Sequence, residues 1–301
     1  MNMHNKINLS LLSIKRIYII PHRKSVITPT KKMRSVCVEF INEEDVKTRI
    51  FQQGDMVLVD GKGEYLKNLS KILREKNVAF DHIQHWITDT IYCEFLKWIG
   101  ISEYVDFDNN SIVVHEQAIT ENVQIQRKIK EENCISHNNT VVIKNGILGN
   151  VKIYFNGDNS ETEIGENTTI RQALIDTSTG VKIFIGNDCM FSSRINILAH
   201  DGHPIFELST GKRINYPKKL VVGNHVWIGQ AVSLLAGAEI PDNCIVGYGS
   251  VTSHRFSEKN TIIAGNPAKV IRHDIIWSAD LDNDEYDSFD ETSHREAKKY
   301  L

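Results

Sequence analysis

Aliphatic residues recur at every sixth position along one stretch of the chain. The anchors are Val222, Ile228, Leu234, Ile240, Val246 and Thr252, of which the first five are aliphatic. A shorter tract repeats this spacing at Ile185, Phe191 and Ile197, and a weaker one at Ile164 and Ile170. A period of six fits neither the 3.6-residue turn of a helix nor the two-residue alternation of a strand. It is typical of a chain that coils into a triangular prism with one flat side per hexapeptide, so it predicts a parallel β-helix.

The six-residue register breaks once. Ile197 and Val222 lie 25 residues apart, which is not a multiple of six. The pattern therefore predicts that the intervening LAHDGHPIFELSTGKRINYPKKLV is a loop extruded from the coil. This loop is polar and carries two histidines, and long loops held by a rigid scaffold are where function usually resides.

The N-terminal part of the chain has a different texture. The apolar run MVLVD (56–60) predicts a buried strand, Gly-Lys-Gly (61–63) a turn, residues 64–77 an amphipathic helix and VAFDHI (78–83) a second strand. This order predicts a small parallel α/β unit. The Gly-Lys-Gly turn is either a structural connection or the edge of a nucleotide or sugar-nucleotide pocket.

Three parts follow from these textures: a small α/β domain over 1–135, a β-helix domain over 136–277 and an acidic tail over 278–301. The tail is either a solvated segment or a docking surface. The 301 residues carry a net charge of -3 and are 41% hydrophobic, which is ordinary for a globular protein. Near-zero net charge gives no whole-chain reason to expect nucleic-acid binding.

Cysteine usage and the N-terminus indicate a compartment. The five cysteines are widely spaced and odd in number, which argues against a disulfide framework or a structural zinc site and fits a reducing compartment. Lys15 and Arg16 interrupt the apolar N-terminus, so we expect neither a signal peptide nor an integral membrane segment. We expect a cytoplasmic protein, with room for a peripheral contact at the inner membrane.

Four segments carry a family resemblance. GHPI, VGNHVWIG, IVGYGSV and AGNPAKVIR resemble the left-handed β-helix acyltransferases of the hexapeptide-repeat superfamily, in particular the bacterial polysaccharide and sialic-acid O-acetyltransferases. The resemblance covers about residues 160–277. It implies a left-handed coil, acetyl-CoA as donor, no metal, and a homotrimer with each active site between two subunits. The implied acceptor is a hydroxyl of a capsular or lipopolysaccharide sugar, or of a sialic acid.

The chemistry needs a base for the acceptor hydroxyl and a donor for the oxyanion of the tetrahedral intermediate. Histidine suits the first role because it titrates near neutral pH. His203, in GHPI, matches the catalytic histidine of the similar enzymes, and His200 is its rival. Asp201, Glu207 or a backbone carbonyl would orient the imidazole. Trp227, 24 residues after His203, matches a tryptophan that assists catalysis in the similar enzymes, or it packs on a coil face.

The resemblance also implies binding residues. Coenzyme A contacts carry over to Gln230, Tyr248, Ser253, His254, Lys269 and Arg272. Most similar enzymes have Thr-Lys where this chain has Ser253-His254. Lys269 and Arg272 would meet the nucleotide phosphates, unless they are simply solvated. Gln172 lies near an acceptor-binding asparagine of the sugar acetyltransferases.

Three other functions share the prism. An N-acetyltransferase acting on an amino sugar nucleotide is the main alternative, because those enzymes also pair a small α/β domain with a β-helix. A γ-type carbonic anhydrase would need three histidines converging on zinc, for which His200, His203 and His225 are available. The donor-side motifs disfavour this metalloenzyme and a non-catalytic scaffold alike.

Overall fold

The computed structural model describes residues 16–20, 26–28, 37–40, 43–52, 55–59, 63–82, 90–93, 103–105, 109–127 and 136–279. The chain divides into two compact units, Met1–Asn109 and Asn110–Leu301. Within these described ranges, no helix is long and apolar enough to cross a bilayer. The predicted Gly-Lys-Gly turn, except Gly63, and the acidic tail from residue 280 onward lie outside them.

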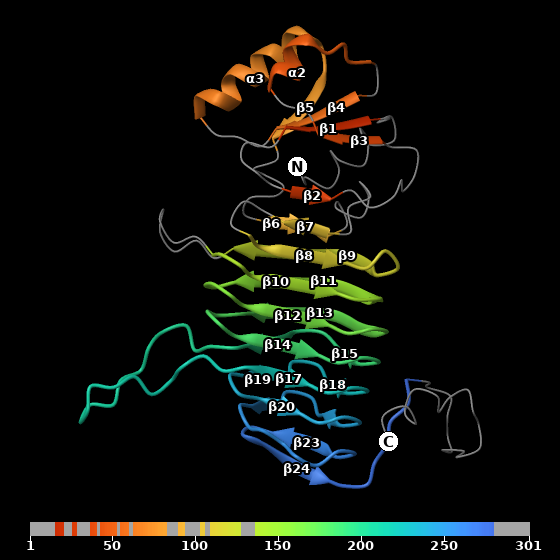
Figure 1. Ribbon diagram of the computed structural model, residues 1–301. Coiled ribbons are helices and arrows are strands. Elements are labelled where there is room, and N and C mark those ends of the chain that lie inside the picture. The colour runs from red at the N-terminus through yellow and green to blue at the C-terminus, as the bar shows by residue number, and fades with distance from the viewer. Residues whose placement is uncertain are drawn as a thin grey trace. The chain divides into compact units, whose positions relative to one another are not determined.

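The first unit contains a parallel sheet with the strand order β3-β1-β4-β5, as Figure 1 shows. Its strands are β1 (Arg16–Ile20), β3 (Cys37–Phe40), β4 (Asp55–Val59) and β5 (Ala79–His82), and its helices are α2 (Glu43–Thr48) and α3 (Gly63–Glu75). The short strands are β2 (Val26–Thr28), which pairs antiparallel with β7 (Glu103–Val105), and β6 (Thr90–Tyr92).

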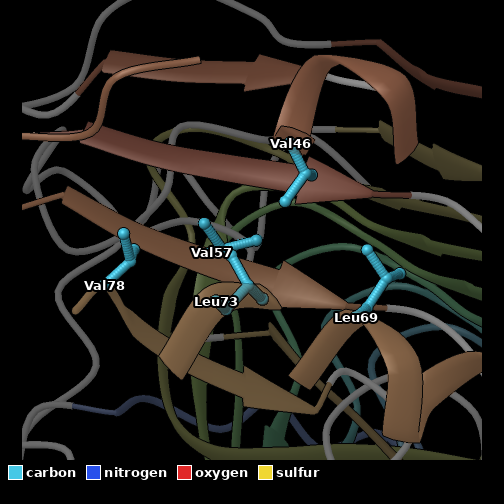
Figure 2. Packing of buried hydrophobic residues seen from close by; sticks show 5 residues of the cluster. All are labelled: Val46, Val57, Leu69, Leu73 and Val78. Carbon is cyan, nitrogen blue, oxygen red and sulfur yellow. The ribbon is translucent and has the colours of Figure 1, made fainter. Parts of the chain in front are cut away.

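Packing of helix on sheet buries a compact apolar cluster in this unit (Figure 2). Val57 of β4 packs against Leu69 and Leu73 of α3, with Val46 and Val78 beside them. The two leucines lie one helical turn apart on one face of α3, as the amphipathic pattern predicted. The predicted strand, helix, strand order over 56–83 is confirmed as β4, α3 and β5.

The second unit is a parallel β-helix with three faces (Figure 1). The first face is formed by β8 (Ser111–Val114), β10 (Thr140–Ile143), β12 (Glu161–Ile164), β14 (Lys182–Ile185), β17 (Leu220–Val222) and β20 (Glu239–Ile240). Three long strands, β9 (Ile119–Arg127), β11 (Gly146–Phe155) and β13 (Thr168–Asp176), cross from the second face to the third. The second face continues with β15 (Met190–Phe191), β18 (Trp227–Ile228), β21 (Ile245–Val246) and β23 (Ile262–Gly265), followed by the antiparallel β24 (Ala268–Arg272). The third face continues with β16 (Ile195–Leu198), β19 (Ser233–Leu235) and β22 (Val251–Thr252).

The predicted anchors fill the interior of this prism. Every anchor of the six-residue pattern is at most 2% exposed. The anchors Val222 and Ile240 pair one coil apart and are 18 residues apart, or three hexapeptides. Ile164 and Ile185 pair in the same way but are 21 residues apart. The longer early coils explain why the six-residue signal weakens upstream.

The β-helix unit begins earlier than the sequence predicted. β8 pairs with β10, and β9 pairs with β11, in the same parallel registers as the later coils. The unit boundary therefore falls between Asn109 and Asn110, whereas we predicted it between residues 135 and 136. Val114 and Ile143 are in register but 29 residues apart, which is not a multiple of six. The six-residue period therefore could not predict this first coil.

Short polar residues turn the corners of the prism. Asn167, Asp188, Asn243 and Asn260 each stand one or two positions before a strand and have φ between 54° and 59°. Asparagine and aspartate tolerate this left-handed conformation better than other residues with a side chain. The Asn167 Nδ2 donates to Asp188 Oδ1 at 3.0 Å, so successive corners are also joined by their side chains.

The extruded loop is confirmed. The chain leaves the third face after β16, runs through residues 199–219, and re-enters on the first face at β17 (Figure 1). The loop is closed on itself by an isolated bridge between Phe206 and Arg213. It therefore projects from the edge between the third and first faces.

Candidate active site

His203 lies exposed near the beginning of the extruded loop. Its position is set by Asn215 on the returning branch, whose Nδ2 donates to the His203 backbone carbonyl at 2.8 Å. The same Nδ2 donates to Asp201 Oδ2 at 2.9 Å, and the Asn215 Oδ1 accepts from the Ile205 N–H at 2.6 Å. The Asn215 amide thus bonds to His203 itself and to residues on both sides of it, Asp201 and Ile205. Asn215 could not be found from the sequence, because no spacing rule pairs two branches of an irregular loop.

Neither predicted orienter touches the His203 ring. The Asp201 carboxylate accepts from Asn215, and Glu207 Oε2 accepts from the Thr210 hydroxyl at 2.7 Å. Among the described residues, no group hydrogen-bonds to the imidazole of His203. Because His203 is exposed, an acceptor or a second copy of the chain can reach its ring.

His200 has a different environment. Its side chain is 10% exposed, and its Nδ1 accepts from the Gly202 N–H at 2.8 Å. Its Nε2 lies 2.9 Å from Asn156 Nδ2 and 3.3 Å from Asp176 Oδ1 at the end of β13. His200 thus fastens the start of the loop to the prism. His200 is thus largely enclosed, whereas His203, three residues later, is exposed.

Trp227 lies on β18 of the second face and is 38% exposed. The ring centroid of Trp227 is 6.1 Å from the ring centroid of Trp277, which packs beside it. The Trp277 indole stacks on His225 at 4.2 Å and donates its Nε1–H to the His225 carbonyl at 2.9 Å. Trp277 lies at the edge of the motifs that carry the family resemblance, so nothing in the sequence pointed to it here.

The two predicted catalytic residues do not meet within one chain. His203 leaves the edge between the third and first faces, whereas Trp227 lies on the second face, which is opposite that edge in a three-sided coil. Figure 1 shows the loop and β18 on opposite sides of the β-helix. A cleft that contains both side chains therefore needs a second copy of the chain.

Two predicted coenzyme A contacts lie together at one corner. Gln230 and Tyr248 stand where successive coils turn from the second face to the third, and the Gly249 N–H donates to the Gln230 carbonyl at 2.9 Å. The Tyr248 side chain is 70% exposed. Ser253 and His254 lie exposed after β22, at the next corner of the prism.

The predicted basic pair lies on β24. Lys269 and Arg272 are both exposed, and neither forms an ion pair within the described part of the chain. Arg272 is in register with Ile262, which continues the row of Ile245 and Trp227 on the second face. Two unpaired cations near the tryptophan suit the phosphates of a nucleotide.

The remaining predicted residues separate in space. Gln172 lies exposed on β13, on the third face. His225 is buried at the corner between the first and second faces, where it stacks on Trp277. The carbonic anhydrase alternative requires three histidines to converge on zinc. Within one chain, the structure instead keeps apart His200, His203 and His225. No group of three metal-ligating side chains occurs in the described ranges.

Comparison with known proteins finds acetyltransferases. No protein-family model matches the chain. It is 34% identical over 191 residues to the polysialic acid O-acetyltransferase of Neisseria meningitidis, covering 56% of this chain and 86% of that protein. It is 33% identical over 119 residues to the enzyme of the same name from Escherichia coli O1:K1, covering 40% of this chain but only 38% of that protein.

Solved structures agree. The polysialic acid O-acetyltransferase OatWY superposes with a TM-score of 0.53 at 29% identity, over 64% of this chain and 86% of that one. The polysialic-acid-specific acetyltransferase NeuO gives 0.50 at 26% identity, over 63% and 94%. The left-handed β-helix and its extruded loop thus define a hexapeptide-repeat acetyltransferase. Within that class, the chain belongs to the polysialic acid O-acetyltransferase family.

Proposed function

We propose that the protein transfers an acetyl group from acetyl-CoA to a hydroxyl of a bacterial surface polysaccharide, in a capsule or a lipopolysaccharide. The observation that carries this proposal is the exposed His203, fixed by its backbone on the extruded loop of residues 199–219. Its relatives are named for polysialic acid, so a sialic acid polymer is the first acceptor to test.

His203 acts as the general base in this proposal. Its imidazole takes the proton of the acceptor hydroxyl as the oxygen attacks the thioester carbonyl. The tetrahedral intermediate then expels the thiolate of coenzyme A, and the imidazolium returns its proton to that sulfur. Trp227 offers one N–H donor and an aromatic wall, which suits either the oxyanion or the pantetheine arm.

The donor binds along the second face and the adjoining corner. Lys269 and Arg272 hold the phosphates, while Gln230 and Tyr248 line the path of the pantetheine arm. Ser253 and His254 border its far end. His254 replaces the lysine of most similar enzymes, so the phosphate charge falls mainly to the β24 pair.

A homotrimer completes the site. On the second face, Ile119, Ile147 and Trp227 belong to one outward row and are each at least 38% exposed. The extruded loop carries exposed apolar side chains of its own, with Phe206 at 58% and Leu208 at 101%. We propose that the loop of one copy covers the apolar row of the next, which brings His203 beside the partner's Trp227. Closed cyclic symmetry then gives three equivalent sites.

An acetyl-CoA consumption assay tests the reaction. The acceptors are a sialic acid polymer, a neutral polysaccharide and an amino sugar nucleotide. We expect free thiol release with a polysaccharide hydroxyl and none in the His203→Ala variant. Turnover confined to the amino sugar nucleotide would instead establish the N-acetyltransferase.

Mixing two inactive variants tests the shared site. His203→Ala and Trp227→Ala chains, co-expressed in equal amounts, should regain about a quarter of the wild-type activity, because random mixed trimers contain one intact site each. Either variant alone should stay near its own low level. Absence of any recovery, with mixed trimers confirmed by mass spectrometry, would contradict a site shared between copies.

A further inference from the structure

A groove of about 520 Å³ lies on the third face, across β9, β11, β13 and β16. Its polar lining comes from these strands and from the corner before β16: Asn122, Asn150, Lys152, Tyr154, Gln172, Arg194 and Asn196. The interior positions between them, such as Val151 and Ile153, are fully buried in the prism core. The groove is therefore built on rigid strands, independently of the extruded loop.

Amide side chains form a row across the groove. Asn150 is in register with Asn122 on one side and Gln172 on the other. The Asn122 Nδ2 donates to Asn150 Oδ1 at 2.8 Å. The Gln172 amide is exposed to solvent. Amides that both donate and accept, with the Tyr154 side chain beside them, suit the hydroxyl groups and rings of sugars.

Two cations in the groove have no counter-ion. Within the described part of the chain, neither Lys152 nor Arg194 makes an ion pair or a side-chain hydrogen bond, and no carboxylate lines the groove. Arg194 also has φ of 60°, at a kind of corner where asparagine or glycine is the less strained choice. A strained residue that keeps an unpaired charge over a groove points to a ligand of opposite charge.

The groove leads towards the loop histidines. Tyr154 is in register with Asp176, whose carboxylate faces His200 at 3.3 Å. His200 stands three residues before His203. A chain of sugars along the third face would therefore end beside the proposed base of the same chain, while the donor occupies the second face of the neighbouring copy.

We propose that this groove is the acceptor subsite for an acidic glycan, in which Lys152 and Arg194 bind carboxylates on sugars next to the one that is acetylated. Arginine and lysine form charge-assisted hydrogen bonds with carboxylates, and the amide row binds hydroxyls. This inference rests on the proposed function for the identity of the ligand as a glycan. It assigns the selection of acidic over neutral polymers to two residues outside the reacting centre.

Direct binding tests this assignment without the reaction. The probes are a sialic acid oligomer, which has one carboxylate per sugar, and the same oligomer with its carboxyl groups reduced to alcohols. Calorimetry with the full-length protein, in the absence of acetyl-CoA, gives the Kd for each. We expect Lys152→Gln and Arg194→Asn each to weaken binding of the acidic oligomer about tenfold. Binding of the reduced oligomer and of coenzyme A should not change.

Matched variants keep the test decisive. Arg194→Asn removes the charge and leaves a residue that accepts the left-handed backbone. Lys182→Gln removes an exposed lysine of the first face, paired with Glu161, and should leave both Kd values unchanged. Lys152→Gln lies inside a strand, so it serves as the second variant if the corner substitution lowers the melting temperature.

The outcomes separate the two proposals. Equal affinity of the wild type for both oligomers, or wild-type affinity of both groove variants, would overturn the subsite. Equally tight binding of a DNA oligonucleotide of the same charge, lost in the same variants, would overturn it in favour of a general polyanion surface. If the expected binding pattern holds but no acceptor is acetylated, the subsite stands and the proposed transfer reaction fails.

Discussion

At the scale of single residues, the loop places two nearby histidines in different environments. His200 is enclosed between the Gly202 N–H and the Asp176 carboxylate, whereas the ring of His203 has no hydrogen-bond partner among the described residues. A general base must reach its substrate, and a buried ring cannot. We therefore expect His203 rather than His200 to be the base, a choice that sequence spacing alone left open.

Replacement of His203 should affect turnover and little else. We expect His203→Ala to lower kcat by roughly 10²- to 10⁴-fold, because proton transfer by a positioned base contributes about that much. The KM for acetyl-CoA and the oligomeric state should stay the same. His115→Ala, which removes another exposed histidine of the β-helix, is the control. Loss of turnover in His200→Ala, with His203→Ala still active, would show that the base was assigned to the wrong histidine.

Cys189 should be chemically inert in the folded protein. Burial raises the pKa of its thiol from 9.0 to about 12, so the reactive thiolate is scarce at any pH at which the protein is handled. Alkylation with iodoacetamide at pH 8, followed by peptide mass spectrometry, should leave Cys189 unmodified in buffer and modified in guanidinium chloride. Rapid labelling of the native protein would mean that this part of the coil opens readily.

At the scale of elements, the sequence predicted what repeats and missed what does not. The six-residue period reports interior positions directly, so the later coils and the extruded loop could be placed in advance. The first coil escaped because its 29-residue length hides the period between Val114 and Ile143. Likewise, the 24-residue spacing of His203 and Trp227 counts positions along the chain but carries no direction. Only the path of the coil shows that they point to opposite sides.

The interior of one late coil offers a stability test. Leu234 is fully buried, while its neighbour Leu235 points outward and is half-buried. We expect Leu234→Ala to lower the free energy of unfolding by about 2–5 kcal/mol, through lost burial and the cavity left behind. Leu235→Ala should cost less than about 1 kcal/mol. Equal losses in chemical denaturation would mean that the register of β19 differs from the one described.

At the scale of the whole molecule, the chain consists of two units with separate cores. The first has its own helix-on-sheet cluster around Val57, and the second closes its backbone hydrogen bonds coil by coil. Every residue to which we assign donor binding lies in the second unit. Acetyl-CoA binding should therefore not depend on the first.

Two truncations test this division. A chain that begins at Asn110 keeps β8 and β9, and it should fold and bind coenzyme A like the full-length protein. A chain that begins at residue 136 loses the first coil, exposes the edges of β10 and β11, and should melt at a lower temperature or aggregate. Calorimetry and coenzyme A titration give both answers. If the longer truncation folds but fails to bind coenzyme A, the first unit contributes to the donor site.

In the proposed shared site, the projection of the loop away from the face that holds Trp227 ties catalysis to the quantity of protein present. A single chain would carry His203 but would lack the partner's Trp227 beside it. Such a chain would have no activity, rather than a reduced activity. Specific activity would then fall on dilution below the concentration at which copies associate, and it would return when the sample is concentrated. In a cell, acetylation would begin only after synthesis had passed that concentration, which gives the modification a threshold without any dedicated regulator.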